Sequence, residues 1–258
     1  MTAAPPPLAG KRGLVVGIAN EHSIAYGCAK AIRQQGGTIA ATWLNDKARP
    51  FVEPLLQQLG ADIAGPLDVE QPGQMEAVFD EIARRWGRLD FVLHAVAFAP
   101  AADLHGRVAD CSAAGFARAM DVSCHSFVRM ARLAEPLLKD GGTLVTMSYY
   151  GAQKVIPGYG IMGPVKAALE AVVSALAAEL GPAGIRVHAV SPGPILTRAA
   201  SGIGAFEQIL DDAARRAPQH QLVTIDDVGA ATALLCGDAA RALTGNVLFV
   251  DAGYHVMG

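Results

Sequence analysis

Charged side chains are scarce in this chain of 258 residues: only 17% are Asp, Glu, Lys or Arg, against 52% hydrophobic residues. The formal net charge is -3, and no basic run occurs. Nucleic acids and anionic membrane surfaces are bound by concentrated positive charge, so neither partner is expected. This apolar composition instead favours a large buried core, such as a sheet covered by helices on both faces.

Cysteine is also rare, and the four residues lie far apart, at Cys28, Cys111, Cys124 and Cys236. Because no Cys-x-x-Cys pair exists, we expect no structural zinc and no other metal site. No apolar run reaches the roughly 18 residues of a membrane-spanning helix. Residues 1–10 contain prolines but lack the apolar core of a signal peptide. We therefore expect a cytoplasmic protein, in a reducing compartment, with no membrane partner.

The usual Gly-x-Gly-x-x-Gly turn of dinucleotide-binding proteins is absent. A looser turn runs from Gly17 to Gly27, between an apolar strand at 14–16 and a helix that extends to 35. Gly17 allows a sharp turn, and Gly27 allows the helix to pack closely on the sheet. Ser23 can cap the helix and donate to a phosphate oxygen. By itself, this turn fits a plain helix start equally well.

Short apolar strands alternate with helical segments along the whole chain. Strands are predicted at 14–16, 38–43, 62–67, 91–95, 144–147, 185–190 and 247–250, and further helices at 47–59, 74–86, 113–138, 167–180 and 225–236. This alternation is typical of βαβ units and a parallel sheet. We predict an α/β fold, a single Rossmann-type doubly wound sheet of about seven strands with helices on both faces, over residues 1–258.

The stretch from Ser148 to Lys166 joins a buried strand to a strong helix former. Tyr159 offers a phenolic proton, and Lys166 offers a positive charge that can lower the pKa of this phenol and hold ribose hydroxyls. The same residues could also be a half-buried loop tyrosine and a solvated helix lysine without a catalytic role. Pro164 is tolerated only in the first turn of a helix, so the helix should begin between 160 and 164.

Three other strand ends offer cofactor contacts. Asp68 and Val69 could meet an adenine amino group, although Asp68 could equally cap a helix. Small residues at 94–97 would let a flat ring pass, or simply allow close core packing. Residues 192–195 could line a nicotinamide, or form a rigid exit turn. Together these ends outline one crevice across the sheet, which is where such folds bind dinucleotides.

These motifs together resemble the short-chain dehydrogenase/reductases, and within them the divergent bacterial NADH-dependent enoyl-[acyl-carrier-protein] reductases. The spacing Tyr159-x6-Lys166 is the specific feature, because ordinary members of the superfamily use Tyr-x3-Lys. The resemblance covers about residues 10 to 255. Its other motifs are Gly17-x5-Ser23-Ile24-Ala25-Tyr26-Gly27, Asn45-Asp46-Lys47, Phe98-Ala99-Pro100, Ser148-Tyr149, Gly193-Pro194-Ile195-x-Thr197, Ala199 to Ile203 and Val250-Asp251-x-Gly253.

The resemblance implies hydride transfer from NADH to C3 of a trans-2-enoyl thioester on acyl carrier protein, in fatty acid biosynthesis, by a homotetramer. Tyr159 would stabilise the enolate oxygen, Lys166 would bind the nicotinamide ribose, and Tyr149 would line the acyl site. The implied cofactor-binding residues are Gly17, Ala19, Ser23, Ile24, Leu44, Asp68, Val69, Ala95, Val96, Ala97, Lys166, Gly193, Ile195 and Thr197. The implied substrate-binding residues are Ala97, Phe98, Tyr149, Tyr159, Met162, Ala199, Ile203 and Phe206, with a lid near 197–215.

Leu44, Ala95 and Ala97 depart from the common family pattern, which leaves fine cofactor contacts open. NADH is expected rather than NADPH, because a 2′-phosphate needs a basic partner after the second strand and residues 43–46 supply none. Two alternatives remain: a related reductase acting on a ketone or another enone, and a non-catalytic NAD-binding protein. The retention of Tyr149, Tyr159 and Lys166 argues against the second.

Overall fold

A computed structural model of the chain describes residues 5–197 and 206–257. In this part, seven parallel strands form one sheet in the order β3-β2-β1-β4-β5-β6-β7, which confirms the predicted fold class. The order reverses between β1 and β4, so their carboxyl ends flank the crevice where such sheets bind ligands. The strands are β1 (Arg12–Val16), β2 (Thr38–Trp43), β3 (Ile63–Pro66), β4 (Phe91–His94), β5 (Gly142–Met147), β6 (Ile185–Pro192) and β7 (Asn246–Val250).

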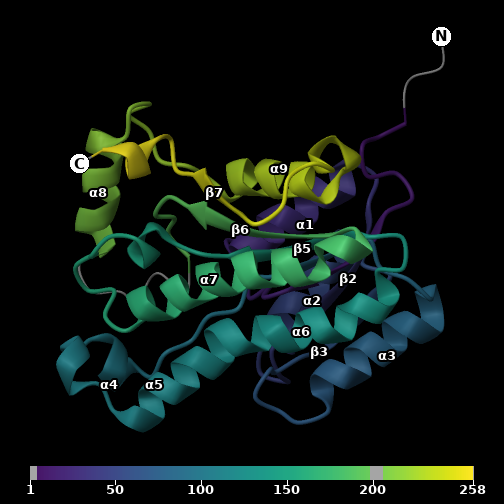
Figure 1. Cartoon of the computed structure of the whole chain (residues 1–258), viewed down its shortest axis with the longest axis horizontal. Coiled ribbons are helices and arrows are strands. Elements are labelled where there is room, and N and C mark those ends of the chain that lie inside the picture. Colours follow the sequence, from purple (N-terminus) through teal and green to yellow (C-terminus); the bar gives the residue numbers. More distant parts are fainter. Residues whose placement is uncertain (1–4, 198–205, 258) are drawn as a thin grey trace.

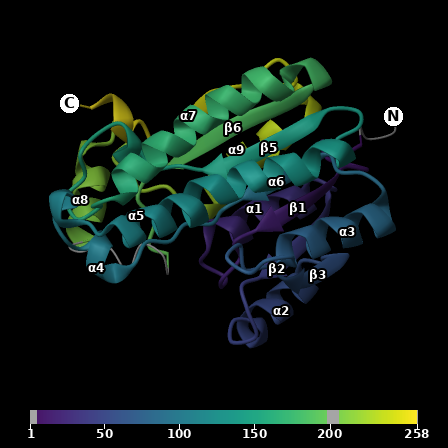
Figure 2. The ribbon, with the colours of Figure 1, turned by 60° about the horizontal axis from the view of Figure 1, so that its bottom comes forward.

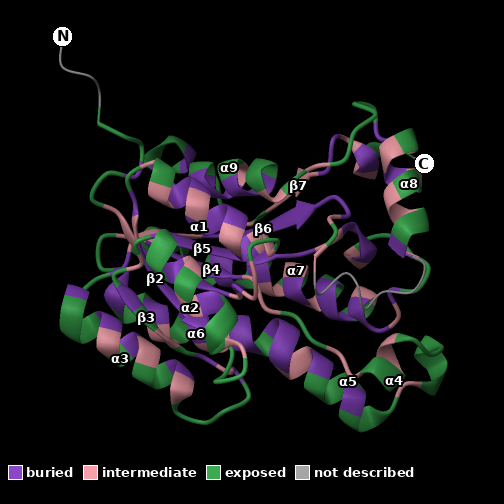
Figure 3. Ribbon diagram, turned by 180° about the vertical axis from the view of Figure 1, so that it is seen from behind, coloured by how far each residue is buried: buried purple, intermediate pink, exposed green. Residues whose placement is uncertain are grey.

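Helices cover both faces of the sheet (Figures 1 and 2). Alternate strand residues point to opposite faces, so Leu14 and Val16 join the core beneath α3, α6 and α7, whereas Val15 joins the core beneath α1, α2 and α9. Figure 3 shows the buried strands between helices whose outer faces are exposed. The helices are α1 (Ile24–Gln34), α2 (Arg49–Gln58), α3 (Gln74–Trp86), α4 (Ala101–Leu104), α5 (Ala113–Met120), α6 (Ser126–Ala134), α7 (Met162–Leu180), α8 (Phe206–Arg216) and α9 (Ile225–Cys236).

The segment predicted as one long helix over 113–138 is helical from 113 to 137, but it is not a single α-helix. A π-helical turn at Asp121–His125 separates α5 from α6, and a 3-10 turn follows at Glu135–Leu137. Ser126 Oγ donates to the Val122 carbonyl oxygen at 2.7 Å, and Ser123 Oγ bonds outside the helix. Such side-chain bonds accompany local widening of a helix, and π turns often lie at functional sites.

Gly27 serves helix–helix packing rather than the helix–sheet packing predicted for it. A Cβ added at Gly27 would lie 2.3 Å from the Ile225 carbonyl oxygen, and one added at Gly229 would lie 2.4 Å from the Gly27 carbonyl oxygen. The backbones of α1 and α9 therefore meet without intervening side chains. The prediction chose the wrong partner because α9 lies some 200 residues further along the chain.

The contact at Gly27 predicts a stability effect. Replacing Gly27 with alanine should lower the free energy of unfolding by about 1–3 kcal/mol, because the added methyl group overpacks the α1–α9 contact. The measurement is urea unfolding, with Gly65→Ala as control, since a Cβ at Gly65 meets nothing within 4 Å. If both variants unfold at the same urea concentration, the close contact does not limit stability.

None of the helices in the described part of the chain is long and apolar enough to cross a membrane.

Candidate active site

The carboxyl ends of β1 and β4 meet at Gly17 and Ala95. Ala95 N donates to the Val16 carbonyl oxygen at 2.9 Å, and Gly17 has φ of 113°. A Cβ at Gly17 would lie 2.2 Å from the Ala95 carbonyl oxygen, so only glycine fits this position. The bare backbone at the switch point of the sheet suits the close approach of a dinucleotide pyrophosphate.

Ser23 occupies the N-cap position of α1, but its side chain does not cap the helix. Ser23 Oγ instead donates to the Asn20 carbonyl oxygen at 2.6 Å and accepts from Ala19 N at 3.3 Å. The predicted capping bond is therefore wrong, because the hydroxyl stabilises the turn before the helix. The first turn of α1 also has no acidic residue. Its N–H groups remain suited to an anion such as a phosphate.

The predicted adenine contacts lie in a loop after β3. Asp68 is no helix cap, because α3 begins after Gly73 and Asp68 Oδ1 accepts from Glu70 N at 3.0 Å. Val69 is buried, and its carbonyl oxygen accepts from Arg129 Nη2 at 2.9 Å. Leu44 follows β2 directly and is 52% exposed.

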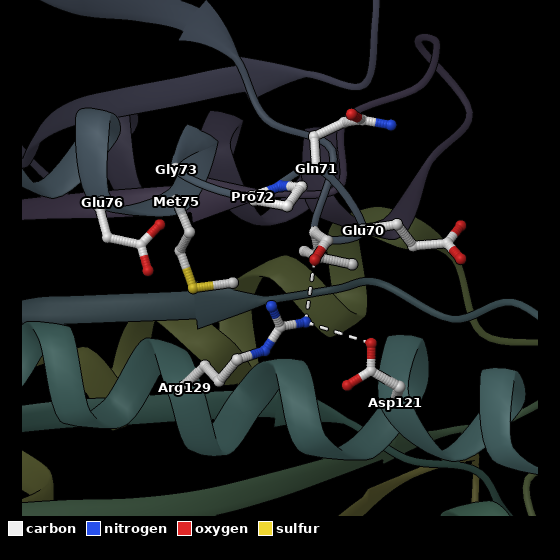
Figure 4. A pocket seen from close by; sticks show the side chains of 9 residues that line it. Glu70, Gln71, Pro72, Gly73, Met75, Glu76, Asp121 and Arg129 are labelled. Carbon is white, nitrogen blue, oxygen red and sulfur yellow. Dashed lines mark hydrogen bonds and ion pairs between the residues drawn. The ribbon is translucent and has the colours of Figure 1, made fainter.

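A pocket of about 390 Å³ lies between this loop and α6 (Figure 4). Arg129 reaches across it to the Val69 carbonyl oxygen, and its Nη2 lies 3.5 Å from Asp121 Oδ2. Of the residues predicted to bind cofactor, only Val69 lines this pocket. The pocket therefore contains one predicted cofactor residue and none of the predicted substrate residues.

The remaining predicted cofactor residues lie after the end of β4, at the end of β6 and at the start of α1. Gly193 is buried against Asp251, and its N–H donates to the Val250 carbonyl oxygen at 2.8 Å. Ile24 begins α1. Val96, Ile195 and Thr197 are half-buried, and Ala97 is exposed.

Tyr159 lies just before α7, which begins at Met162, as the position of Pro164 predicted. The Tyr159 side chain is buried and packs edge-on against Tyr149, with ring centroids 4.9 Å apart. Gly151 makes room for this ring, since a Cβ there would lie 2.5 Å from Tyr159 Cδ1. The structure thus brings the two predicted catalytic tyrosines into direct contact.

Lys166 lies inside α7 and is buried. Its Nζ donates to the Met147 carbonyl oxygen at the end of β5, at 2.6 Å. Burial lowers the pKa of Lys166 to about 8, partly offset by Cys124 and Glu170. The ammonium group is therefore held at the strand end from which the tyrosine loop departs.

The expectation that Lys166 lowers the pKa of Tyr159 is wrong in this structure. Burial, and then the neighbouring Tyr149, raise the pKa of Tyr159 well above its usual value, and Lys166 is not among the causes. The pKa of Tyr149 is also raised, mainly by burial. Tyr159 is therefore a neutral hydrogen-bond donor near neutral pH, rather than a phenolate.

Two buried hydroxyl groups at the strand ends have no hydrogen-bond partner within the described residues: Tyr149 Oη and Ser191 Oγ. Buried polar atoms are normally paired, and a bound ligand is one common explanation for exceptions. Together with the bare backbone at Gly17, these atoms fit a site that holds a polar cofactor and substrate.

A pocket of about 410 Å³ lies beside Tyr159, which is the one predicted substrate residue in its lining; the other lining residues include Val108, Ile156 and Pro164. Met162 and Phe206 are buried at the starts of α7 and α8. Phe98 is 40% exposed. Ala199 and Ile203 lie outside the described residues.

Phe98 and α8 are each held by contacts that no motif indicated. Ser123 Oγ accepts from Phe98 N at 2.9 Å and donates to the Phe98 carbonyl oxygen at 3.0 Å. The π turn that carries Ser123 therefore positions Phe98. Tyr254 Oη donates to Asp212 at 3.0 Å, which ties α8 to the last turn of the chain.

His94 has a structural role, because both of its ring nitrogens are held by neighbouring hydroxyl groups. Its ring nitrogens lie 2.9 Å from Thr146 Oγ1 and 2.8 Å from Ser126 Oγ. Burial, and then the charge of Lys166, lower the pKa of His94 to about 3, so the ring is neutral. No group of three or more His, Cys, Asp or Glu side chains within the described ranges could hold a metal ion.

The sequence model of the family described as "Enoyl-(Acyl carrier protein) reductase" matches residues 17–255. Enoyl-[acyl-carrier-protein] reductase [NADH] 1 of Rhizobium meliloti is 48% identical over 249 residues, covering 96% of this chain and 92% of that protein. A crystal structure of the Anaplasma phagocytophilum enoyl-(acyl-carrier-protein) reductase in complex with NAD is 45% identical, with a TM-score of 0.94 over 97% of this chain and 96% of that one.

The Bacillus cereus enoyl-acyl carrier protein reductase, solved with NADP+ and indole naphthyridinone, is 37% identical, with a TM-score of 0.95 over 98% of this chain and 99% of that one. These matches extend over nearly the whole chain and confirm the resemblance seen in its motifs. The chain belongs to the enoyl-(acyl carrier protein) reductase family.

Proposed function

We propose that this chain reduces trans-2-enoyl thioesters carried by acyl carrier protein, and that Tyr159, Lys166 and Tyr149 carry the chain's part of the chemistry. The chain is an NADH-dependent oxidoreductase of fatty acid biosynthesis. The observation that carries the residue assignment is the contact between the buried ring of Tyr159 and the half-buried ring of Tyr149, beside the strand end that holds Lys166.

NADH, when bound, supplies the hydride that adds to C3 of the enoyl thioester. Gly17, Ala19, Ser23 and the start of α1 would hold its phosphates, and Lys166 would donate to the nicotinamide ribose. Negative charge develops on the thioester oxygen as the hydride arrives. Tyr159 keeps its proton because its pKa is raised, so it can donate a hydrogen bond to that oxygen.

Tyr149 lines the acyl site and excludes water from it. Its ring covers one edge of Tyr159, and its hydroxyl has no protein partner in the described part of the chain. Of the lid predicted near 197–215, residues 198–205 lie outside the described part of the chain, and the rest from 206 onward belongs to α8. Closure of such a segment completes a site and removes solvent.

NADH should be preferred over NADPH. The exposed Leu44 and the acidic Asp46 follow β2, and a 2′-phosphate placed there would find no cation before Lys47. We expect kcat/KM to be about 10- to 100-fold higher with NADH, since a charge-assisted hydrogen bond contributes about 1.5–3 kcal/mol. Initial rates with both cofactors test this. The Leu44→Arg variant should show a smaller difference in kcat/KM between NADH and NADPH. Equal kcat/KM values would contradict it.

The protein acts in the cytoplasm as a homotetramer. The exposed face of α7 consists largely of small residues, which suits close contact with a second copy: Ala167, Ala171, Ser174, Ala175 and Ala178. Light scattering distinguishes this assembly from a 26.7 kDa monomer.

A further inference from the structure

The loop that presents Tyr149 is held at both ends by one carboxylate. Glu170 Oε1 accepts from Ser148 Oγ at 2.6 Å, and Glu170 Oε2 accepts from Gln153 Nε2 at 3.1 Å. Short bonds to an ionised carboxylate are about twice as strong as neutral ones. Glu170 lies one turn after Lys166 on α7, so consecutive turns of this helix hold the end of β5 and the loop that follows it.

We propose that Glu170 is a positioning residue for the reaction: its carboxylate fixes the loop from Ser148 to Gln153, which carries Tyr149, and its negative charge balances the buried ammonium group of Lys166. The inference deepens the proposed function and rests on it. No motif of the sequence marked Glu170, because its partners follow from the fold.

Glu170 adds side-chain hydrogen bonds to a loop in which Tyr149 is otherwise held by packing against the core and by the backbone bond from Ala152 N to its carbonyl oxygen. The Tyr149 hydroxyl has no partner within the described residues, and its ring touches only one other aromatic ring there, that of Tyr159. The loop continues as a tight turn, Tyr150–Ala152, whose Gly151 lies against Tyr159. A shift of the loop would therefore move Tyr149 and disturb the packing of Tyr159 at the same time.

The charge of Lys166 also depends on Glu170. Three titratable groups from different elements influence Lys166 or are influenced by it: His94 on β4, Cys124 on the π turn and Glu170 on α7. His94 is neutral, since its pKa is lowered to about 3, and burial raises the pKa of the Cys124 thiol, which stays protonated. Burial lowers the pKa of Lys166, whereas Cys124 and then Glu170, one turn along α7, raise it.

Three variants separate the two roles. Glu170→Gln keeps an acceptor for Ser148 and removes the charge, Ser148→Ala removes the loop bond and keeps the charge, and Glu170→Ala removes both. Glu179→Gln, at the exposed end of the same helix, is the matched control. NADH affinity is measured by fluorescence titration between pH 6 and 9, and KM for a 2-enoyl thioester is measured at pH 7.

NADH affinity should be lost as the pH rises and Lys166 loses its proton. We expect this loss to occur at a lower pH in Glu170→Gln than in the wild type, because the missing carboxylate charge destabilises the ammonium form of Lys166. Ser148→Ala should keep the wild-type pH dependence and raise the KM for the enoyl thioester about tenfold, since a charge-assisted bond is lost. Glu170→Ala should show both effects, and Glu179→Gln neither.

An unchanged pH dependence of NADH affinity in Glu170→Gln would overturn the charge role. Wild-type KM values in Ser148→Ala and Glu170→Ala would overturn the positioning role. If the wild type itself reduced no enoyl thioester, the proposed function would fail, whereas the NADH titrations would still decide the role of Glu170 toward Lys166.

Discussion

Replacing Tyr159 with phenylalanine is expected to lower kcat on a 2-enoyl thioester by about 10²–10³-fold, the range measured when one oxyanion donor is removed. Only the hydroxyl group is lost, so the buried ring still packs against Tyr149 and Gly151. The donor matters most when charge develops on the thioester oxygen, so the effect belongs in kcat. NADH affinity should stay unchanged, because Lys166 rather than Tyr159 is assigned to the ribose.

Steady-state kinetics and NADH titration check this result together. Tyr150→Phe is the matched control: it removes a hydroxyl from the neighbouring buried tyrosine, which packs against Phe249 and Tyr254 instead of Tyr159. This control should keep a kcat close to that of the wild type. Full activity of the Tyr159→Phe variant would remove Tyr159 from the chemistry.

Replacing Lys166 with methionine is expected to weaken NADH binding by about 10- to 100-fold, because a hydrogen bond from a charged donor contributes about 1.5–3 kcal/mol. Methionine fills much of the space of the buried lysine stem, so the α7 packing should survive. The bond to the Met147 carbonyl oxygen is also lost, which should lower the thermal unfolding temperature slightly.

Fluorescence titration with NADH measures the cofactor affinity of the Lys166→Met variant directly. Lys139→Met, at an exposed position before β5, tests whether the loss of any lysine weakens NADH binding. Wild-type NADH affinity in Lys166→Met would contradict the assignment of this lysine to the ribose.

The fold followed from the sequence because its strands are short, apolar and buried on both faces. The pattern predicted β2, α3 and α9 with the bounds that the structure has, since the flanking residues end each element locally. The start of α7 could be predicted for the same reason, because Pro164 restricts where a helix can begin.

What the sequence could not predict depends on contacts between distant segments. The π turn between α5 and α6 carries Ser123, which bonds to Phe98 about 25 positions away. The raised pKa of Tyr159 follows from burial and from Tyr149, whereas the sequence suggested only Lys166. The carboxylate of Glu170 joins Ser148 and Gln153 across the fold. Each of these features concerns a partner that local spacing does not reveal.

The central claim is that this site reduces a carbon–carbon double bond conjugated to a thioester. The most direct measurement compares the rates of NADH oxidation by the wild-type protein with a 2-enoyl thioester and with a 3-ketoacyl thioester of the same chain length. We predict faster oxidation with the enoyl thioester, and a loss of that rate in Tyr159→Phe. Faster oxidation with the 3-ketoacyl thioester would contradict the account and favour a ketone reductase.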